Sequence, residues 1–418
     1  MSHMELAYLS KLPGIGGIMK SCPEDFLVEE ITAGGEILEL DKTFERAGEE
    51  GNFTYFVLQK RNWNTLQALK EVGRKLHCGL KRFGYAGVKD RNAVTTQLAS
   101  AFKIDKAALL NLRIKDIKIN AAWGAKEKVR IGDLLGNRFT ISIRNVSPCS
   151  ADQMKSIYED TKGLFPNYFG EQRFGSIRKN THLVGKAIVS GNFKEAVLGY
   201  LTYIDEGEET EGKEARRQLA AEGDFKRALE YFPTYLGYEL TLLNYLSSYP
   251  NDYVNAMRKL PRGLSLMFVH AYQSHLFNKA LSKRISERGS SVIAGDLVCR
   301  MNSFGFPDVT NAERVDDVAE AEKGIEKGEL FLTSEVVGSE TKEIGDYERQ
   351  IMEEEGIKKE NFLIHSFPEI SSKGSRRCNF IPLKDFRFNQ ENEIGKFNFL
   401  LPAGAYATVA VREFIEKK

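Results

Sequence analysis

Residues 53–76 read FTYFVLQKRNWNTLQALKEVGRKL and join two patterns of different period. Residues 53–59 are mainly β-branched and aromatic, which predicts a strand. Residues 65–76 repeat apolar side chains at spacings of three, three and four, with Asn64 in place to cap the first turn. The repeat predicts an amphipathic helix with its basic residues facing outward, and its apolar positions are Leu66, Leu69, Val72 and Leu76.

Further strands are predicted on both sides of this pair. Short runs rich in β-branched or aromatic residues, bounded by turn formers, lie at residues 25–31, 97–102, 117–121 and 138–146. The resulting order is strand, strand, helix and then three strands. Such an order favours an α+β fold with a mainly antiparallel sheet.

The pattern changes after Phe174. Residues 181–189, 193–201 and 269–281 have helical periodicity, and a polar, Glu-rich stretch separates the second from the third. Strand patterns return at residues 379–388 and 396–401, and a short helix is expected after Gly404. We therefore expect a strand-rich domain built from both chain ends and interrupted by a helix-rich insertion.

Composition excludes several classes of protein. The 418 residues include 59 Lys and Arg against 58 Asp and Glu, and 42% are hydrophobic, so disorder, collagen and coiled coil are excluded. The longest nearly apolar run, residues 399–411, is broken by Pro402 and Gly404 and is too short for a membrane span. The first residues show no basic stretch followed by an apolar core. We expect a cytoplasmic protein.

The net charge of +1 conceals a basic segment. Residues 60–91 contain nine Lys and Arg but only Glu71 and Asp90 as acids. Acidic residues instead crowd residues 205–214, 316–329 and 340–360, where solvated helix faces are expected. The basic segment is either a surface that binds a polyanion or an ordinary solvated face.

No metal site is expected from the spacing of potential ligands. Five cysteines lie far apart without a CxxC pair, at Cys22, Cys78, Cys149, Cys299 and Cys378. His270 and His275 are five residues apart, which separates them by about 140° around a helix. We interpret the thiols as buried or inert and the two histidines as non-ligating.

The segment GYAGVKDRNAVTTQ at residues 84–97 places one carboxylate, Asp90, between Lys89 and Arg91. On base rates, an aspartate after Gly-x-Lys is a turn or capping residue. Nearby cations, however, keep a carboxylate ionised and available as a nucleophile or base, and they also attract phosphate. Asp90 is therefore a candidate catalytic residue.

A second cluster, PNYFGEQRFG at residues 166–175, combines aromatic rings, carboxamides and an arginine. These groups stack on and hydrogen-bond to an extruded base. The structural alternative is an aromatic loop packed into the core.

These segments resemble the TruD family of tRNA pseudouridine synthases. Residues 84–97 are similar to the family signature around its catalytic aspartate, and residues 166–175 to its NYFGxQRFG motif. Lys20 with the PEDF of residues 23–26 resembles the N-terminal K-x-x-PEDF element. Shorter similarities extend over nearly the whole chain, at residues 136–139, 271–274, 276–278 and 401–404.

The resemblance implies a fold and a division of the chain. Residues 1–175 and 385–418 would form a pseudouridine-synthase catalytic domain with a mixed, mainly antiparallel sheet. Residues 176–384 would form an inserted, helix-rich domain specific to TruD proteins. This division agrees with the interrupted organisation described above.

It also implies roles for individual residues. Asp90 would be the catalytic carboxylate, with Lys20 beside it to orient and stabilise its charge. Phe26 and Phe169 would shape the pocket, with Phe169 stacking on the target base and Asn167 hydrogen-bonding near it. Tyr406 is expected among the substrate-binding residues. The expected RNA-binding residues are Lys70, Arg74, Lys75, Lys81, Arg82, Lys89 and Arg91.

The implied reaction converts a uridine of tRNA, typically at position 13, to pseudouridine. It involves no redox or group transfer, so no cofactor and no metal are expected, and tRNA is the only expected partner of a monomeric enzyme. A non-catalytic RNA-binding protein would use the same basic and aromatic residues but would place no demand on Asp90. An RNA methyltransferase would need a Gly-rich turn after a parallel strand, which the sequence does not show.

Overall fold

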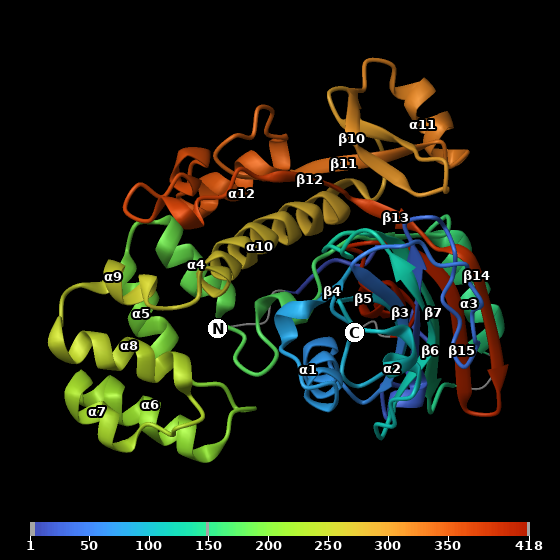
Figure 1. Cartoon of the computed structure of the whole chain (residues 1–418). Coiled ribbons are helices and arrows are strands. Elements are labelled where there is room, and N and C mark those ends of the chain that lie inside the picture. The colour runs from blue at the N-terminus through green and yellow to red at the C-terminus, as the bar shows by residue number, and fades with distance from the viewer. Residues whose placement is uncertain (1–4, 148–149, 416–418) are drawn as a thin grey trace. The chain divides into compact units, whose positions relative to one another are not determined.

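A computed structural model describes residues 5–147 and 150–415, which form two compact units (Figure 1). The first, here called the sheet unit, comprises Ser10–Phe165, Asn302–Phe306 and Ile381–Lys418. The second, the helical unit, comprises Met1–Leu9, Pro166–Met301 and Pro307–Phe380. The assignment of a catalytic role to one and an inserted role to the other stays a prediction.

The sheet unit contains one large mixed sheet. Its central path runs β14-β15-β7-β2-β5-β3-β6, with β1 beside β7 and β4 beside β5. Among the described strands of this sheet, only β2 and β5 pair in parallel, and the other pairs are antiparallel. The strands are β1 (Ile18–Met19), β2 (Phe26–Thr32), β3 (Phe53–Arg61), β4 (Phe83–Tyr85), β5 (Val94–Phe102), β6 (Ile117–Ala125), β7 (Leu134–Arg144), β14 (Lys384–Glu391) and β15 (Ile394–Pro402). The predicted α+β class with a mainly antiparallel sheet is confirmed.

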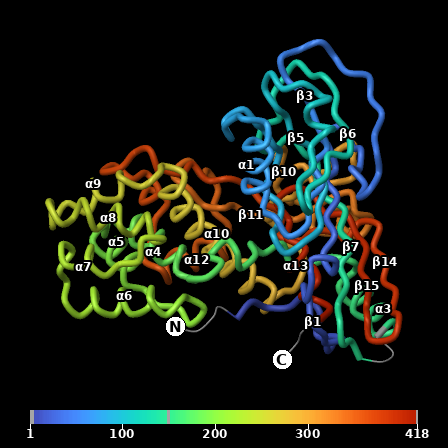
Figure 2. The backbone as a smooth tube through the Cα atoms, turned by 60° about the horizontal axis from the view of Figure 1, so that its bottom comes forward, coloured from blue at the N-terminus to red at the C-terminus, as the bar shows by residue number. Residues whose placement is uncertain are grey.

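Both ends of the chain contribute to this sheet. Figure 2 shows the red strands β14 and β15 beside β7, and β15 pairs with β7 from Ile394 opposite Arg144 to Pro402 opposite Gly136. A side chain at Gly136 would overlap the carbonyl oxygen of Leu401, so the close approach of the two strands requires glycine there. Two of the short similarity segments, residues 136–139 and 401–404, thus meet on adjacent strands.

Four helices of the described residues belong to the sheet unit: α1 (Thr65–Lys75), α2 (Lys106–Leu110), α3 (Ser150–Asp160) and α13 (Ala407–Ile415). The predicted N-cap is confirmed, because Asn64 Oδ1 accepts a hydrogen bond of 2.8 Å from Gln67 N. Helix α1 buries Leu69 and Val72 against Phe56 of β3. The prediction that Leu66 lies on the buried face is wrong: it is 38% exposed, and Ala68 is buried in its place.

The helical unit follows the predicted change of pattern. Its helices are α4 (Thr181–Val189), α5 (Phe193–Thr202), α6 (Thr210–Glu222), α7 (Phe225–Tyr231), α8 (Gly237–Ser248), α9 (Tyr253–Arg258), α10 (Arg262–Arg288), α11 (Val318–Glu326) and α12 (Asp346–Glu355). All of them except α11 contribute buried residues to one core, which is centred on α4, α5 and α10. A four-stranded sheet contains β9 (Leu297–Met301), β10 (Pro307–Arg314), β11 (Leu330–Val336) and β12 (Ser375–Cys378). Two further strands, β8 (Leu164–Pro166) and β13 (Phe380–Pro382), each contain residues of both units and pair with each other.

Several predicted elements differ in extent from the observed ones, and two of these differences have a clear cause in the backbone. Residues 379–388 are not one strand: β13 ends at Pro382, and the register of β14 shifts where Asp385 adopts a φ of 54°. Residues 269–281 are only the middle of α10, which begins after Pro261 and ends at Arg288, directly before Gly289 with a φ of 61°. In both cases the true boundary is set by backbone geometry and not by the hydrophobic repeat.

No helix of the described residues is long and apolar enough to cross a membrane. Within the same residues Cys22, Cys78, Cys299 and Cys378 are free thiols, and the latter two are buried. Cys149 lies outside the described residues.

Candidate active site

Asp90 lies on the loop between β4 and β5, and this loop is tied to the core on both sides. Lys89 N donates a 2.9 Å hydrogen bond to Thr65 Oγ1, and that hydroxyl donates to Gln97 Oε1 at 2.7 Å. Gln97 Nε2 in turn donates to Gly87 O at 3.0 Å. Because Thr65 and Gln97 are fully buried, the backbone that presents Asp90 is rigidly positioned.

The Asp90 carboxylate forms an ion pair with Lys20. The Lys20 Nζ to Asp90 Oδ2 distance is 2.7 Å, and the two side chains are 18% and 29% exposed. The same ammonium lies 3.9 Å from the centroid of the Phe26 ring. Asn92 Nδ2 donates to Lys20 O at 2.9 Å. The segments that carry Asp90 and Lys20 are therefore connected by both an ion pair and a hydrogen bond. A partly exposed carboxylate with one oxygen fixed by an ammonium is suited to act at a reacting atom.

Phe26 is held below this pair by the PEDF turn. The ring is 2% exposed and packs edge-on against Phe139, with the centroids 5.9 Å apart. Asp25 in the same turn accepts hydrogen bonds from Arg144 at 2.8 to 3.1 Å and from Cys22 N at 3.1 Å. Burial alone would raise the pKa of Asp25, but the bonds from Arg144 and Cys22 lower it below its ordinary value. An ionised Asp25 therefore fixes the turn from which Phe26 projects.

Lys60, which lies near the loop that carries Asp90, is a residue that sequence reasoning did not single out. Its side chain is 1% exposed, and Nζ donates to two backbone carbonyls, Trp63 O at 2.6 Å and Asp90 O at 2.9 Å. Burial lowers the pKa of Lys60 to about 7, although Asp90 raises it and Lys89 lowers it further. A lysine at the last buried position of a strand pattern carries no sequence signal for such a role; only its partners reveal it.

Replacing Lys60 with methionine should change the pH dependence of stability. Because folding lowers this pKa from 10.5 to about 7, the unfolded chain binds more protons between those values. Burying the charged ammonium therefore lowers the free energy of unfolding by its full amount below about pH 7. This loss of stability becomes smaller as the pH rises toward 10. Urea unfolding measures the effect. Over this pH range the free energy of unfolding of the wild type should rise by a few kcal/mol relative to that of Lys60→Met, at about 1.4 kcal/mol per pKa unit. If the free energies of unfolding of the wild type and of Lys60→Met changed with pH in parallel, the lowered pKa of Lys60 would be contradicted.

Asn167 and Phe169 lie in the helical unit. Asn167 is 4% exposed, and its amide donates to Cys378 O at 3.0 Å and accepts from Arg377 Nη2 at 2.6 Å. The Arg377 guanidinium lies 4.1 Å from the Phe169 ring centroid. Asn278 on α10 accepts from Phe169 N at 2.8 Å and donates to Phe169 O at 2.9 Å. The similarity segments 166–175 and 276–278 are therefore in direct contact. The backbone N–H and C=O of Phe169 are both bonded to Asn278, which fixes the position of its half-buried ring.

Tyr406 lies in the sheet unit directly before α13. Its side chain is half-buried, and its carbonyl accepts the hydrogen bonds of Val409 N and Ala410 N at 3.0 Å. The ring therefore projects from a backbone that is fixed by the first turn of a helix.

The expected RNA-binding residues differ in what their charges contact. Lys70, Lys75, Lys81 and Arg91 are exposed, and no described residue pairs with their side chains. Exposed Arg74 pairs with Glu71, and half-buried Arg82 donates to the carbonyls of Phe102 and Lys103 at 2.9 Å.

Lys89 differs from the other basic residues of this set. It is 6% exposed, and Nζ lies 2.8 Å from Glu30 Oε2 and 2.5 Å from Asn137 Oδ1. Its ammonium is occupied inside the sheet unit because buried Glu30 needs a counter-charge. We therefore leave Lys89 out of the proposed RNA contacts.

Among the described residues, no three His, Cys, Asp or Glu side chains are grouped so that they could hold a metal ion. His275 stacks on His182 with the ring centroids 4.7 Å apart, and burial lowers its pKa to about 4, assisted by His182. His275 therefore packs as a neutral ring at neutral pH.

Comparison with known proteins gives one consistent result. The family model of tRNA pseudouridine synthase D (TruD) matches residues 3–414. A protein of Methanosarcina acetivorans named "Probable tRNA pseudouridine synthase D" is 37% identical over 98% of this chain and 95% of its own length. One of the same name from Methanopyrus kandleri is 36% identical over 96% and 95%. A crystal structure of a TruD protein from Methanosarcina mazei has a TM-score of 0.80 and 35% identity, over 99% of this chain and 96% of that one.

The fold and these relatives define an RNA-modifying isomerase of the pseudouridine synthase class. The chain belongs to the TruD family, tRNA pseudouridine synthase D, and its substrate is tRNA. This membership excludes the alternative of a non-catalytic RNA-binding protein.

Proposed function

We propose that this enzyme converts uridine 13 of tRNA to pseudouridine with Asp90 as the catalytic carboxylate. The observation that carries the assignment is the 2.7 Å ion pair between Lys20 and Asp90, set on a loop that buried hydrogen bonds hold in place. The position in the tRNA rests on the resemblance to the family alone.

The reaction needs few protein groups. The C1′ to N1 glycosidic bond breaks, the detached uracil turns, and C5 bonds to C1′. The C5 proton leaves and N1 takes up a proton, so the net reaction is an isomerisation that needs no co-reactant. Three routes use the carboxylate: attack on C1′, attack on C6, or removal of the 2′ proton to give a glycal. All three require ionised Asp90. In each, Lys20 fixes one carboxylate oxygen and leaves the other for the substrate.

The remaining substrate contacts follow the family motifs. In the proposal, Phe169 stacks on the target base and Asn167 hydrogen-bonds beside it. Phe26 and Phe169 shape the pocket, and Tyr406 also contacts the substrate. The charge of Arg377 over the Phe169 ring keeps that ring in one orientation.

Release of tritium from tRNA labelled at uracil C5 tests this proposal. Transcripts with uridine at position 13 should release one tritium per molecule without added cofactor, and transcripts with cytidine there should release none. Equal release from both would overturn the choice of position while leaving the reaction in place. No release from either would overturn the proposed reaction.

The exposed lysines of the basic segment should contribute to RNA affinity through phosphate contacts. If Lys70, Lys75 and Lys81 each neutralise a phosphate, changing all three to glutamine should lower the slope of log K against log salt by about two. Filter binding over a salt series measures it. A matched triple change at exposed lysines of the helical unit, Lys226, Lys323 and Lys342, should leave the slope unaltered. Equal slopes for both triple variants would show that the basic segment is only solvated.

A further inference from the structure

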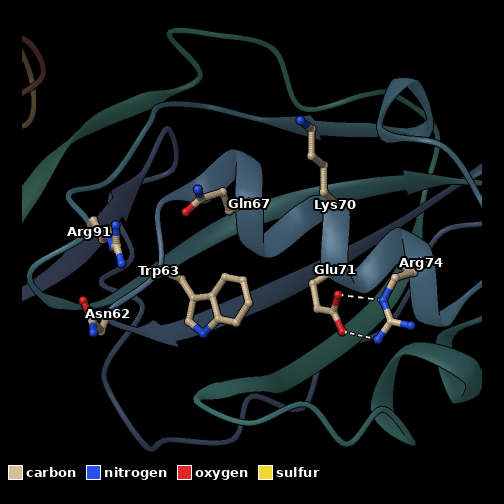
Figure 3. Close-up of a pocket in the computed structure, with 7 residues that line it drawn as sticks. All are labelled: Asn62, Trp63, Gln67, Lys70, Glu71, Arg74 and Arg91. Atoms are coloured by element: carbon tan, nitrogen blue, oxygen red, sulfur yellow. Dashed lines mark hydrogen bonds and ion pairs between the residues drawn. The ribbon is translucent and has the colours of Figure 1, made fainter. Parts of the chain in front are cut away.

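A shallow pocket of about 430 Å³ lies in the sheet unit beside the catalytic loop (Figure 3). Helix α1 and the segments on either side of it supply its walls: Asn62, Trp63, Gln67, Lys70, Glu71, Arg74 and Arg91. The pocket combines an aromatic ring, two carboxamides and three cations. These are the groups with which proteins hold a single-stranded nucleotide.

Trp63 provides the surface for stacking. One part of the indole packs against the core that contains Leu69 and Val72, while the side chain as a whole is only half-buried. Figure 3 shows the ring between Asn62 and Glu71, among the other side chains that line the pocket. A ring fixed along one edge and open to a pocket offers an ordered face to a base, so little entropy is lost on stacking.

The charges of the pocket favour a phosphate. Glu71 is the only acid in the wall, and it is engaged by Arg74 through bonds of 2.6 and 2.8 Å, drawn as dashed lines in Figure 3. Lys70 and Arg91 are exposed and pair with no described side chain. Two positive charges therefore remain for a ligand.

The carboxamides of Asn62 and Gln67 add specific polar contacts. Both side chains are exposed, and within the described part of the chain neither amide group is used in a hydrogen bond. Each offers one acceptor and two donors toward the pocket, which is the pattern needed for the edge of a base.

One ammonium group hydrogen-bonds to the backbone of both the pocket and the catalytic residue. Lys60 Nζ donates to the carbonyl of Trp63 at 2.6 Å and to the carbonyl of Asp90 at 2.9 Å. Arg91 in the pocket wall directly follows Asp90 in the chain. The backbones of Trp63 and Asp90 are therefore adjacent. In a bound RNA, a nucleotide stacked on Trp63 would lie close in sequence to a uridine presented to Asp90.

We propose that this pocket binds a nucleotide of single-stranded RNA that flanks the target uridine. Its base stacks on Trp63, Asn62 and Gln67 contact the base edge, and Lys70 and Arg91 contact the backbone phosphate. The inference rests on the proposed function, because Asp90 defines where the target lies. It assigns to the sheet unit a contact with RNA that is separate from the target base.

Tryptophan fluorescence can test this directly, because the chain contains only Trp63 and Trp123 and the latter is 8% exposed. The Asp90→Asn protein, titrated with a short single-stranded RNA that contains the target uridine and its flanks, should show quenching. The Trp63→Leu form of that protein, which keeps the apolar packing but not the stacking ring, should not. RNA affinity should fall roughly 5- to 150-fold in Trp63→Leu.

A second measurement needs no change in the protein. Abasic substitution at the flanking nucleotides, one at a time, should remove the quenching at one position only. Quenching that survives every abasic substitution would overturn the proposal. So would saturation of the signal by free uridine or adenosine monophosphate at RNA-like concentrations, since this would indicate a site for a free nucleotide.

The two proposals can fail separately. Normal RNA affinity in a folded Trp63→Leu protein, with pseudouridine still formed, would overturn the nucleotide pocket alone. Quenching at one position without any pseudouridine formation by the wild type would overturn the catalytic proposal but support the pocket as an RNA contact.

Discussion

Replacing Asp90 with asparagine should abolish pseudouridine formation while tRNA binding and stability stay close to those of the wild type. The amide is nearly the same size as the carboxylate but neither nucleophilic nor basic, so every route through C1′, C6 or the 2′ proton is blocked. The side chain is 29% exposed and its loop is held through backbone atoms and through Thr65 and Gln97. Single-turnover tritium release at saturating tRNA measures the loss.

Asp41 offers a matched control for this change. It belongs to the sheet unit and also pairs with a lysine, Lys118, at 2.5 Å, but the two side chains are 65% and 66% exposed. Asp41→Asn should leave the rate unchanged. Substantial turnover by Asp90→Asn would remove Asp90 from the catalytic role and would require another carboxylate in its place.

Changing Lys20 to methionine should reduce the single-turnover rate roughly 10²-fold or more, by comparison with other positioned electrostatic groups. Methionine retains the length and the packing on Phe26 but leaves Asp90 Oδ2 without its ammonium partner. The carboxylate then loses both its orientation and its nearest positive charge. Because Lys20 contacts Asp90 and not the RNA backbone in this proposal, the loss should appear in the rate at saturating tRNA and not in affinity.

The control is Lys118→Met, which removes the ammonium of the exposed pair with Asp41. Exposed pairs contribute little, so its rate should match that of the wild type. A Lys20→Met rate equal to that of the Lys118 variant would show that the ion pair at Asp90 is structural only.

Much of the fold could be predicted because the relevant signals are local. The boundaries of α4 match the predicted residues 181–189, since the apolar repeat ends where Gly191 adopts a positive φ. Helix α1 and its Asn64 cap also follow from neighbouring residues. In contrast, α6 to α9 were not predicted individually, because a polar, Glu-rich stretch hides the few buried positions that each short helix contributes to the core.

The amino-acid sequence by itself determined the family of this protein and the candidate role of Asp90, because motif spacing records chemistry that a single short segment must keep. It also determined the basic character of residues 60–91, but not which charges are available to RNA. Only the tertiary structure decided that Lys89 forms an ion pair with buried Glu30. It also decided that Lys60 donates to the carbonyls of Trp63 and Asp90, and that Trp63 lines a pocket. These properties depend on burial and on partners brought together by the folded sheet unit, and no pattern along the chain records them.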